Sequence, residues 1–500
     1  MKQARRVLWL MPITACLFLT SCIDGFDDDE TYTSDVKHQQ VSTPVLKDSA
    51  NAEGTQAFVM WPVVHGASGY TVSVLNVTDE DHPDTLVNNK TIDAVKFSFK
   101  REDDQYYDVK VVAIGNTKYH NTNSDTAMLR VSSFVEQLGD EIPSGSDLAE
   151  IIPTMLTQYA ADKDSTAEFG INLEPGGEFT ISGKIDLKNY QATICSTNPN
   201  KPAKIVMSAT TGFVTQGGVK FKNLLFDCEN FTDKNDAILC MSSAPTFEKT
   251  GPQYWTTFPI LVQNCRTKNL KARLIADGGT PWVIQNVLIK KCIIEVDQEA
   301  QSKTKNGSGY CDIIEFGAGF CVNFSIENST VYSTTTLATA STSMPTIFRN
   351  GSKKLPGELL DGSTYKECTY SINNSTFVNI SKATSGSNAP MFYWLRQRGQ
   401  SYCTVTNKNN IYVDCAGRRV KRYSLLAGQN GNMGAVFSNN VYNYTDATET
   451  VLVEEEWNTY PNPDQVEFEA QLVLDEETGI WKVGNADVIA AGCGDPRGLE

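Results

Sequence analysis

Residues 313–328 read IIEFGAGFCVNFSIEN, and this stretch contains the two kinds of segment that recur through the C-terminal part of the chain. The first kind is a short apolar pair followed by one variable residue, and the second is an apolar strand that ends in or near an asparagine. The first kind recurs at 238–240, 274–276, 313–315, 347–349, 392–394 and 425–427. The second kind recurs at 261–264, 283–286, 324–328, 370–374, 405–407 and 436–439.

The spacing of these segments predicts a solenoid. Successive copies of the first segment lie 33 to 45 residues apart, a period typical of a coil that buries its apolar face only by stacking on the next coil. Equivalent residues of adjacent coils should then lie about 4.8 Å apart. The recurring asparagine predicts an internal ladder of stacked amides, which is a structural role.

A helix and a turn precede the repeat. Apolar residues at 148, 151, 152, 155, 156 and 159 form one helical stripe, with Ser146 or Asp147 as the cap. Short strands are expected at 184–187, 192–195 and 204–207. The helix, the I-x-L-x-P-G turn at 171–176 and these strands resemble the opening of pectate-lyase-like right-handed parallel β-helices. This resemblance spans residues 146–500, of which the acidic, non-repeating stretch 445–500 is expected to cap the open end.

A smaller β domain is predicted over residues 43–135. Apolar and polar residues alternate along 57–61, 70–74 and 107–113, as in half-buried strands. About 90 residues is the size of a β-sandwich, and the pattern resembles a fibronectin type III module. We interpret Trp61 as a core residue. The predicted fold class is therefore all-β, with a sandwich followed by a right-handed parallel β-helix and its capping helix.

The N-terminus carries an export signal. Lys2, Arg5 and Arg6 precede an apolar run from Val7 to Thr20 that is too short to span a bilayer. Residues 19–22 read LTSC, which resembles the lipobox of bacterial lipoproteins, so residues 1–22 are predicted to be a signal peptide with Cys22 as the lipidated residue. The acidic linker 23–42, with DGFDDDE at 24–30, is similar to the surface-export tether of Bacteroidota outer-membrane lipoproteins.

Composition excludes several classes of protein. With 40% apolar and 20% charged residues the chain is not intrinsically disordered. A net charge of −16 argues against nucleic acid as a partner. The 13 cysteines show no CxxC spacing, which gives no support to a zinc site, and we interpret those of the repeat as free, buried thiols.

Candidate site residues come from the predicted stacking of coils. The third position of the first segment reads Cys240, Ala276, Glu315, Arg349, Trp394 and Ala427. If these side chains point outward, Glu315, Arg349 and Trp394 form one patch suited to a sugar. If they point inward, they form a buried ion pair or lie at a turn, and the register leaves both readings open.

Basic stretches extend this patch. Residues 396–422 hold seven Arg or Lys residues against Asp414 alone, beside Tyr393 and Trp394, and we include Tyr393, Arg396 and Arg398 as candidate ligand-binding residues. Lys268, Lys271 and Arg273 form a second basic cluster. No cofactor is predicted. Calcium is an alternative because four acidic residues lie close together in the sequence, although they do not form a complete calcium-binding loop: Asp227, Glu229, Asp233 and Asp236.

All four histidines precede the predicted β-helix, which excludes a mechanism that needs a histidine there. The lipobox, the sandwich, the helix and the G-D-P-R ending at 494–497 resemble uncharacterised β-helix lipoproteins that Bacteroidota encode beside polysaccharide-utilisation genes. The resemblance implies an outer-membrane, lipid-anchored protein that faces the cell exterior and binds an acidic polysaccharide, with glycan-import machinery as a further partner. The first alternative is a polysaccharide lyase that cleaves a uronate-containing glycan, and the second is a structural or adhesin-like surface protein. Catalytic residues are not identified.

Overall fold

The computed structural model describes residues 37–50, 56–78, 82–102, 105–133, 135–161, 168–249, 253–302, 311–336, 345–350, 368–381, 391–393, 403–415, 434–443 and 469–500. The chain divides into two compact units, residues 1–133 and residues 134–500. Cys22 lies outside the described residues, so its predicted lipidation stays a prediction. Within the described parts of the chain, no helix is long and apolar enough to cross a membrane.

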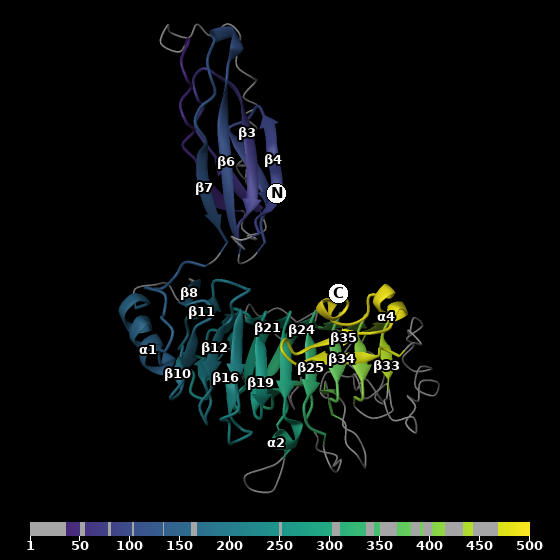
Figure 1. Cartoon of the computed structure of the whole chain (residues 1–500). Helices are drawn as coiled ribbons and strands as arrows, with labels where there is room; N and C mark the ends of the chain where they lie inside the picture. The colour runs from purple at the N-terminus through teal and green to yellow at the C-terminus, as the bar shows by residue number, and fades with distance from the viewer. Residues whose placement is uncertain are drawn as a thin grey trace, which may run out of the picture. The chain divides into compact units, whose positions relative to one another are not determined.

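The first unit is a β-sandwich, as the alternating pattern predicts (Figure 1). One antiparallel sheet has the order β1-β2-β5, and the other has the order β4-β3-β6-β7. The strands are β1 (Lys47–Ala50), β2 (Gln56–Met60), β3 (Ala67–Asn76), β4 (Asp84–Ile92), β5 (Lys96–Lys100), β6 (Tyr106–Gly115) and β7 (Ala127–Ser132), with the short 3-10 helix η2 (Thr117–Tyr119) between β6 and β7.

Aromatic residues fill the sandwich core. Trp61 is buried and packs edge-on against Tyr70 with ring centroids 5.2 Å apart, which confirms its predicted core position. The Tyr70 hydroxyl accepts a hydrogen bond from the Val64 amide at 2.9 Å. The Tyr107 hydroxyl accepts one from the Glu102 amide at 2.8 Å, the kind of backbone contact by which a tyrosine fixes a sandwich corner.

The second unit is a parallel β-helix, which confirms the predicted solenoid. Three parallel sheets run along the coil stack, and we number them I, II and III. Sheet I contains β8 (Glu168–Leu173), β11 (Gln191–Ser196), β14 (Val219–Lys222), β18 (Ile260–Gln263), β21 (Trp282–Lys290), β24 (Phe320–Glu327), β27 (Cys368–Asn373), β30 (Cys403–Lys408) and β32 (Gly434–Ser438), with β17 (Tyr254–Thr256) paired to β21.

The other two sheets have shorter strands. Sheet II contains β9 (Glu178–Thr180), β12 (Ala203–Val206), β15 (Leu224–Asp227), β19 (Arg266–Leu270), β22 (Ile293–Val296), β25 (Thr330–Ser333), β28 (Thr376–Val378), β31 (Ile411–Val413) and β33 (Val441–Asn443). Sheet III contains β10 (Ile185–Asp186), β13 (Phe213–Thr215), β16 (Ala237–Met241), β20 (Arg273–Ala276), β23 (Ile314–Phe316), β26 (Phe348–Asn350) and β29 (Phe392–Tyr393).

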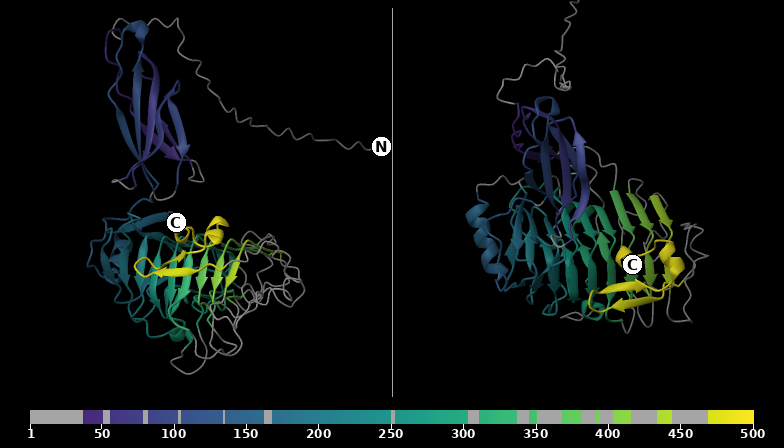
Figure 2. Two further views of the ribbon diagram at one scale, coloured as in Figure 1. Left: turned by 45° about the vertical axis from the view of Figure 1, so that its right-hand side comes forward. Right: turned by 45° about the horizontal axis from the view of Figure 1, so that its top comes forward.

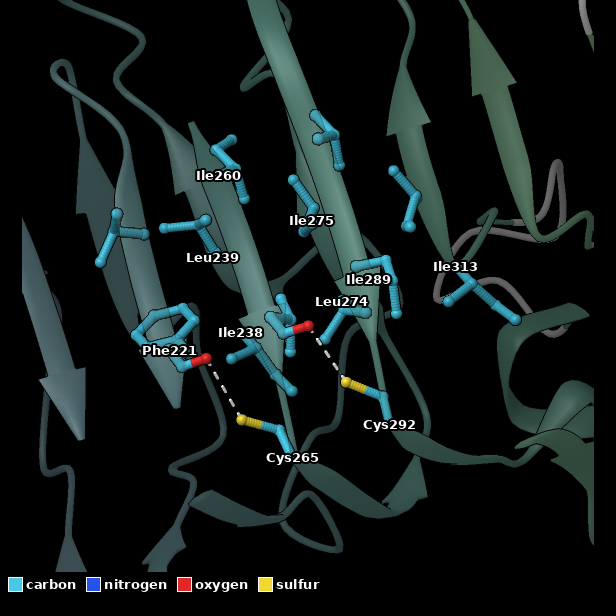
Figure 3. Close-up of a cluster of buried hydrophobic side chains, with 14 of the residues drawn as sticks. Phe221, Ile238, Leu239, Ile260, Cys265, Leu274, Ile275, Ile289, Cys292 and Ile313 are labelled. Atoms are coloured by element: carbon cyan, nitrogen blue, oxygen red, sulfur yellow. Dashed lines mark hydrogen bonds between the residues drawn. The ribbon is translucent and has the colours of Figure 1, made fainter. Parts of the chain in front are cut away.

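Apolar side chains from successive coils stack inside the β-helix. On sheet III, Leu239 lies opposite Ile275, which lies opposite Ile314, and all three are buried. Figure 3 shows this interior, where the Cys265 thiol donates to the Phe221 carbonyl oxygen at 3.5 Å. Each fully buried aliphatic or aromatic side chain contributes about 1.5–3 kcal/mol, so the stacking of coils is what stabilises the unit.

The helix α1 (Leu148–Tyr159) covers the first coil (Figure 1). Its cap is Asp147, whose carboxylate accepts a hydrogen bond from the Ala149 amide at 2.9 Å. Leu148, Ile152 and Leu156 are buried in the same cluster as the first coil, as their predicted stripe requires. The residues before the helix also join the coil, since Ile142 forms a parallel bridge to Leu173.

The asparagine ladder exists along the turns between sheets I and II, where the predicted members Asn264, Asn328, Asn374 and Asn439 lie. From β14 onward, a residue with positive φ separates each sheet I strand from the next sheet II strand, at Asn223, Asn264, Lys291, Asn328, Asn374, Asn409 and Asn439. The side-chain amide of Asn409 donates to Asn374 Oδ1 at 2.9 Å, and the side-chain amide of Asn439 donates to Asn409 Oδ1 at 2.9 Å. The predicted members Asn286 and Asn407 instead lie within sheet I strands, because the sequence pattern does not reveal where each strand stops.

The described C-terminal residues lie along the side of the stack. The hairpin β34 (Leu472–Asp475) and β35 (Ile480–Val483) crosses the outer face of sheet II, as both views in Figure 2 show. Trp481 packs edge-on against Tyr332 of β25 at 6.0 Å. The helix α4 (Ala486–Ala490) and the 3-10 helix η4 (Pro496–Gly498) follow, and a short helix α2 (Gln298–Ser302) leaves the stack after β22. The sequence predicts a cap over the end of the stack. The hairpin instead packs along the side of the stack, because the outer face of sheet II is apolar at Ile293, Tyr332 and Val378.

Candidate functional site

The candidate site lies on the strands of sheet III. The register places Ala276 opposite Glu315, Glu315 opposite Arg349, and Arg349 opposite Tyr393. The predicted neighbours Glu315 and Arg349 are therefore on adjacent coils. Tyr393, and not Trp394, is opposite Arg349, because the apolar pair Ile347–Phe348 corresponds to Met391–Phe392 rather than to Phe392–Tyr393. Trp394, Arg396 and Arg398 lie outside the described residues.

Glu315 pairs with an arginine of the preceding coil. The Arg273 Nε donates to Glu315 Oε2 at 2.8 Å, and Arg273 NH1 donates to the Asn235 carbonyl oxygen at 2.6 Å. The two side chains are 15% and 18% exposed, so part of each faces solvent. Of the predicted second basic cluster, only Arg273 contributes here, since Lys268 lies on the sheet II strand β19 and the Lys271 ammonium donates to the Glu229 carbonyl oxygen.

Arg349 forms a second ion pair, with Asp312. The Nε of Arg349 lies 2.5 Å from Asp312 Oδ2, and the Arg349 side chain is 25% exposed. The other oxygen of Asp312 accepts hydrogen bonds from the amide and the hydroxyl of Thr346, each at 2.7 Å. The sequence left open a buried ion pair between Glu315 and Arg349. In the structure each of them instead pairs with another residue on an adjacent coil, Glu315 with Arg273 and Arg349 with Asp312.

Lys234 completes the cluster of charges. It is 8% exposed and lies between β15 and β16, and burial, together with the nearby Arg273, lowers the pKa of its ammonium group. The Cys311 thiol and the Glu315 carboxylate act in the opposite direction. Sequence reasoning missed Lys234 and Asp312. The available signal was their position before the apolar pairs, with Lys234 four residues before Ile238 and Asp312 directly before Ile313.

Two of the acidic residues that left calcium as an alternative have other partners. Asp236 Oδ1 accepts hydrogen bonds from the amide and the hydroxyl of Thr211, at 3.0 and 2.9 Å. Asp227 lies 3.5 Å from the Lys204 ammonium. Among the described residues, no group of three or more His, Cys, Asp or Glu side chains could hold a metal ion.

A buried carboxylate lies next to the ion pairs. Asp277 accepts hydrogen bonds from the amides of Gly279, Ala318 and Gly319, at 3.0, 2.8 and 2.6 Å. Burial raises the pKa of its carboxyl, and these three donors lower it. Asp277 therefore joins the turns that follow β20 and β23, which supports the strands that carry Arg273 and Glu315.

The chemistry of the cluster is that of an anion-binding or proton-transfer surface. Arg273 and Arg349 each have N–H groups in addition to the Nε that meets a carboxylate, and guanidinium groups suit carboxylate ligands. Lys234 is a buried amine with a lowered pKa, a property shared by lysines that act as bases. The fold and this cluster define the protein as a parallel β-helix protein with an ionic strip, formed by Arg273, Glu315 and Arg349, across three coils.

Two family models match the sequence. DUF4992, described as a domain of unknown function, matches residues 2–172, and DUF4957, also described as a domain of unknown function, matches residues 177–334. No curated protein matches the chain.

Solved structures resemble parts of the chain. A pectate lyase from Erwinia chrysanthemi in complex with tetragalacturonic acid is 10% identical, with a TM-score of 0.16, and the match covers 71% of this chain and 88% of that one. A family 28 exopolygalacturonase of Yersinia enterocolitica is 10% identical, with a TM-score of 0.19, over 83% of this chain and 97% of that one. A mutant of FN3tt is 14% identical, with a TM-score of 0.15, over 19% of this chain and 96% of that one. These identities and scores are too low to transfer a function.

Proposed function

We propose that this protein binds an acidic polysaccharide along sheet III. The observation that carries the proposal is the ionic strip itself, in which Arg273, Glu315 and Arg349 occupy three successive coils and are each partly exposed. Adjacent strands are about 4.8 Å apart, so a linear polymer that lies parallel to the stack meets an equivalent position at every coil. A compact globular ligand would not use this repetition.

The charges favour an acidic glycan. Arg273 and Arg349 supply two partly exposed cations, and both are guanidinium groups that bind carboxylates through paired N–H donors. Tyr393 lies at the next position of the row, where an aromatic residue is suited to contact the apolar face of a sugar. The predicted basic residues Arg396 and Arg398 follow it in the sequence, outside the described residues.

The same proposal includes the location of the protein. The lipobox-like sequence at 19–22 and the acidic linker support a lipid anchor at Cys22 in the outer membrane, facing the cell exterior. A surface protein that retains glycan would act together with glycan-import machinery. Labelling of growing cells with a radioactive fatty acid tests the anchor, because replacement of Cys22 by Ser should abolish incorporation.

Glycan binding is tested by affinity electrophoresis of the purified mature protein in gels that contain pectic polysaccharides, alginate or glycosaminoglycans. We expect retardation by at least one acidic glycan and about tenfold weaker retardation of R349Q, since a guanidinium contact is lost. The matched control is R130Q, which removes an arginine paired with Asp108 on the sandwich. Equal migration of the wild type in every gel would exclude the proposal.

Lys234 favours a second candidate function, a polysaccharide lyase. In such a reaction an amine base removes the proton from the carbon next to the uronate carboxylate, and cations stabilise the developing negative charge. A carbon–carbon double bond then forms as the bond to the neighbouring sugar oxygen breaks, and that oxygen takes up a proton from water. The lowered pKa of Lys234 raises the fraction of neutral amine at a given pH, so the rate should rise with pH until that group is deprotonated. The products are unsaturated and absorb ultraviolet light. Loss of this absorbance in K234M, with glycan retention unchanged, would support the lyase, and absence of product from the wild type would exclude it.

A further inference from the structure

The last residues of the chain bind one coil after another. We call residues 491–497 the clasp. At one end of it, the side-chain amide of Asn439 donates to the Ala491 carbonyl oxygen at 2.8 Å. The backbone amide of Gly494 donates to the Asn409 carbonyl oxygen at 2.7 Å. The clasp thus begins at the turns that lead into β33 and β31.

Asp495 continues the clasp to the next two coils. Its amide donates to the Thr376 hydroxyl at 2.9 Å, and its Oδ2 accepts a hydrogen bond from the Thr330 hydroxyl at 2.8 Å. Thr376 begins β28 and Thr330 begins β25, so Asp495 joins two adjacent strands of sheet II. The carboxylate is completely buried, and its charge is met by the Arg497 guanidinium at 2.5 Å.

Arg497 ends the clasp on the carbonyl oxygens of two turns. NH1 donates to Lys291 at 3.0 Å, and NH2 donates to Cys292 at 3.0 Å and to Asn328 at 3.3 Å. Lys291 and Asn328 are ladder positions with positive φ. A guanidinium group suits this place because its rigid, planar set of donors reaches several acceptors at once.

The clasped coils include the three that carry the ionic strip and the one that carries Tyr393. Following the chain, the coil of Lys291 contains Arg273, the coil of Asn328 contains Glu315, the coil of Thr376 contains Arg349, and the coil of Asn409 contains Tyr393. In a solenoid each coil contacts only its neighbours, so the spacing of distant coils depends on a series of separate interfaces. A clasp that binds these four coils and that of Asn439 at once adds a direct link between them.

We propose that the clasp, through Asp495 and Arg497, positions the sheet III residues of these four coils for ligand binding from another face of the β-helix. Its release should let the clasped coils open locally while the first coils, which it does not bind, stay closed. The statement about ligand rests on the proposed function, whereas the statement about local opening does not.

The test is hydrogen–deuterium exchange of the full mature chain, comparing the wild type with R497Q. We expect about tenfold faster exchange in segments 313–333 and 368–378, because hydrogen bonds to a charged group are lost, and unchanged exchange in segment 168–227. R497K should fall between the two, because an ammonium group retains the charge but not the planar donors. The control V473A alters a residue of the same C-terminal segment that is 66% exposed.

The variant T330V provides the same test if R497Q does not fold, since it removes only the hydroxyl that donates to Asp495. Unchanged exchange in the clasped coils of R497Q and T330V would overturn the proposal. Faster exchange with undiminished glycan retardation would overturn the positioning role. If the wild type binds no glycan, the proposed function is refuted. Faster exchange in R497Q would then still support the effect of the clasp on the coils.

Discussion

A buried column of side chains follows the ladder turns and satisfies backbone groups that the strands leave without partners. The Ser329 hydroxyl accepts a hydrogen bond from the Cys292 amide at 3.0 Å, and the Ser375 hydroxyl accepts one from the Ser329 amide at 3.2 Å. Asn410 then accepts from the Ser375 amide at 2.9 Å. A buried N–H without an acceptor costs about 1–3 kcal/mol, so these side chains determine whether each turn can be buried.

Replacement of Asn410 tests this role. N410A removes the acceptor of the Ser375 amide and the donor to the Ile372 carbonyl oxygen, and it should lower the free energy of unfolding by about 1–3 kcal/mol. N410S should cost less, about 1 kcal/mol, because serine occupies the same place at 329 and 375. Urea unfolding of the two variants measures the difference. Equal losses would contradict an acceptor role.

Cys240 permits a test of burial through pH. Burial raises the pKa of its thiol to about 11, and Asp277 acts in the same direction. The thiolate is the reactive form, so alkylation by iodoacetamide should accelerate about tenfold per pH unit between pH 7 and 10 and should be slow at neutral pH. Mass spectrometry of the native protein, with the urea-denatured chain as the control, reports the rate. Rapid alkylation at pH 7 would contradict this environment.

Among the elements, α1 closes the apolar end of the first coil. Ile152 is completely buried between the helix and that coil, and I152A should cost about 2–5 kcal/mol because the first coil loses packing. Q158A, on the exposed side of the same helix, should change stability by less than about 0.5 kcal/mol. Urea unfolding followed by circular dichroism measures both. A small loss in I152A would show that the helix contributes little to the stack.

At the scale of the whole molecule, two units with separate cores should unfold separately. Trp61 belongs only to the sandwich core, and W61A should cost that unit about 3–5 kcal/mol. Differential scanning calorimetry should then show one transition at a lower temperature and a second one unchanged, with M128A as an exposed control. An equal shift of both transitions would contradict independent units.

Much of the fold was predictable from the sequence alone, because the relevant signals are local and repeated. Alternation at 57–61 and 107–113 predicts strands of the sandwich, and the helical stripe at 148–159 predicts α1 and its burial. The period of 33 to 45 residues predicts the stack, and with it the adjacency of Glu315 and Arg349. The strands, the helix and the stack of coils all follow from the positions at which apolar residues recur, and these positions can be read from the sequence.

Only the tertiary structure decided the details of the site. An offset of one residue puts Tyr393 rather than Trp394 beside Arg349, and a strand pattern of period two does not resolve such an offset. Arg273 forms an ion pair with Glu315, and Arg349 forms one with Asp312. These partners lie on different coils and depend on side-chain length and burial, which the sequence spacing does not predict. The clasp was likewise hidden, because Arg497 and Lys291 become neighbours only when the end of the chain folds back along the stack.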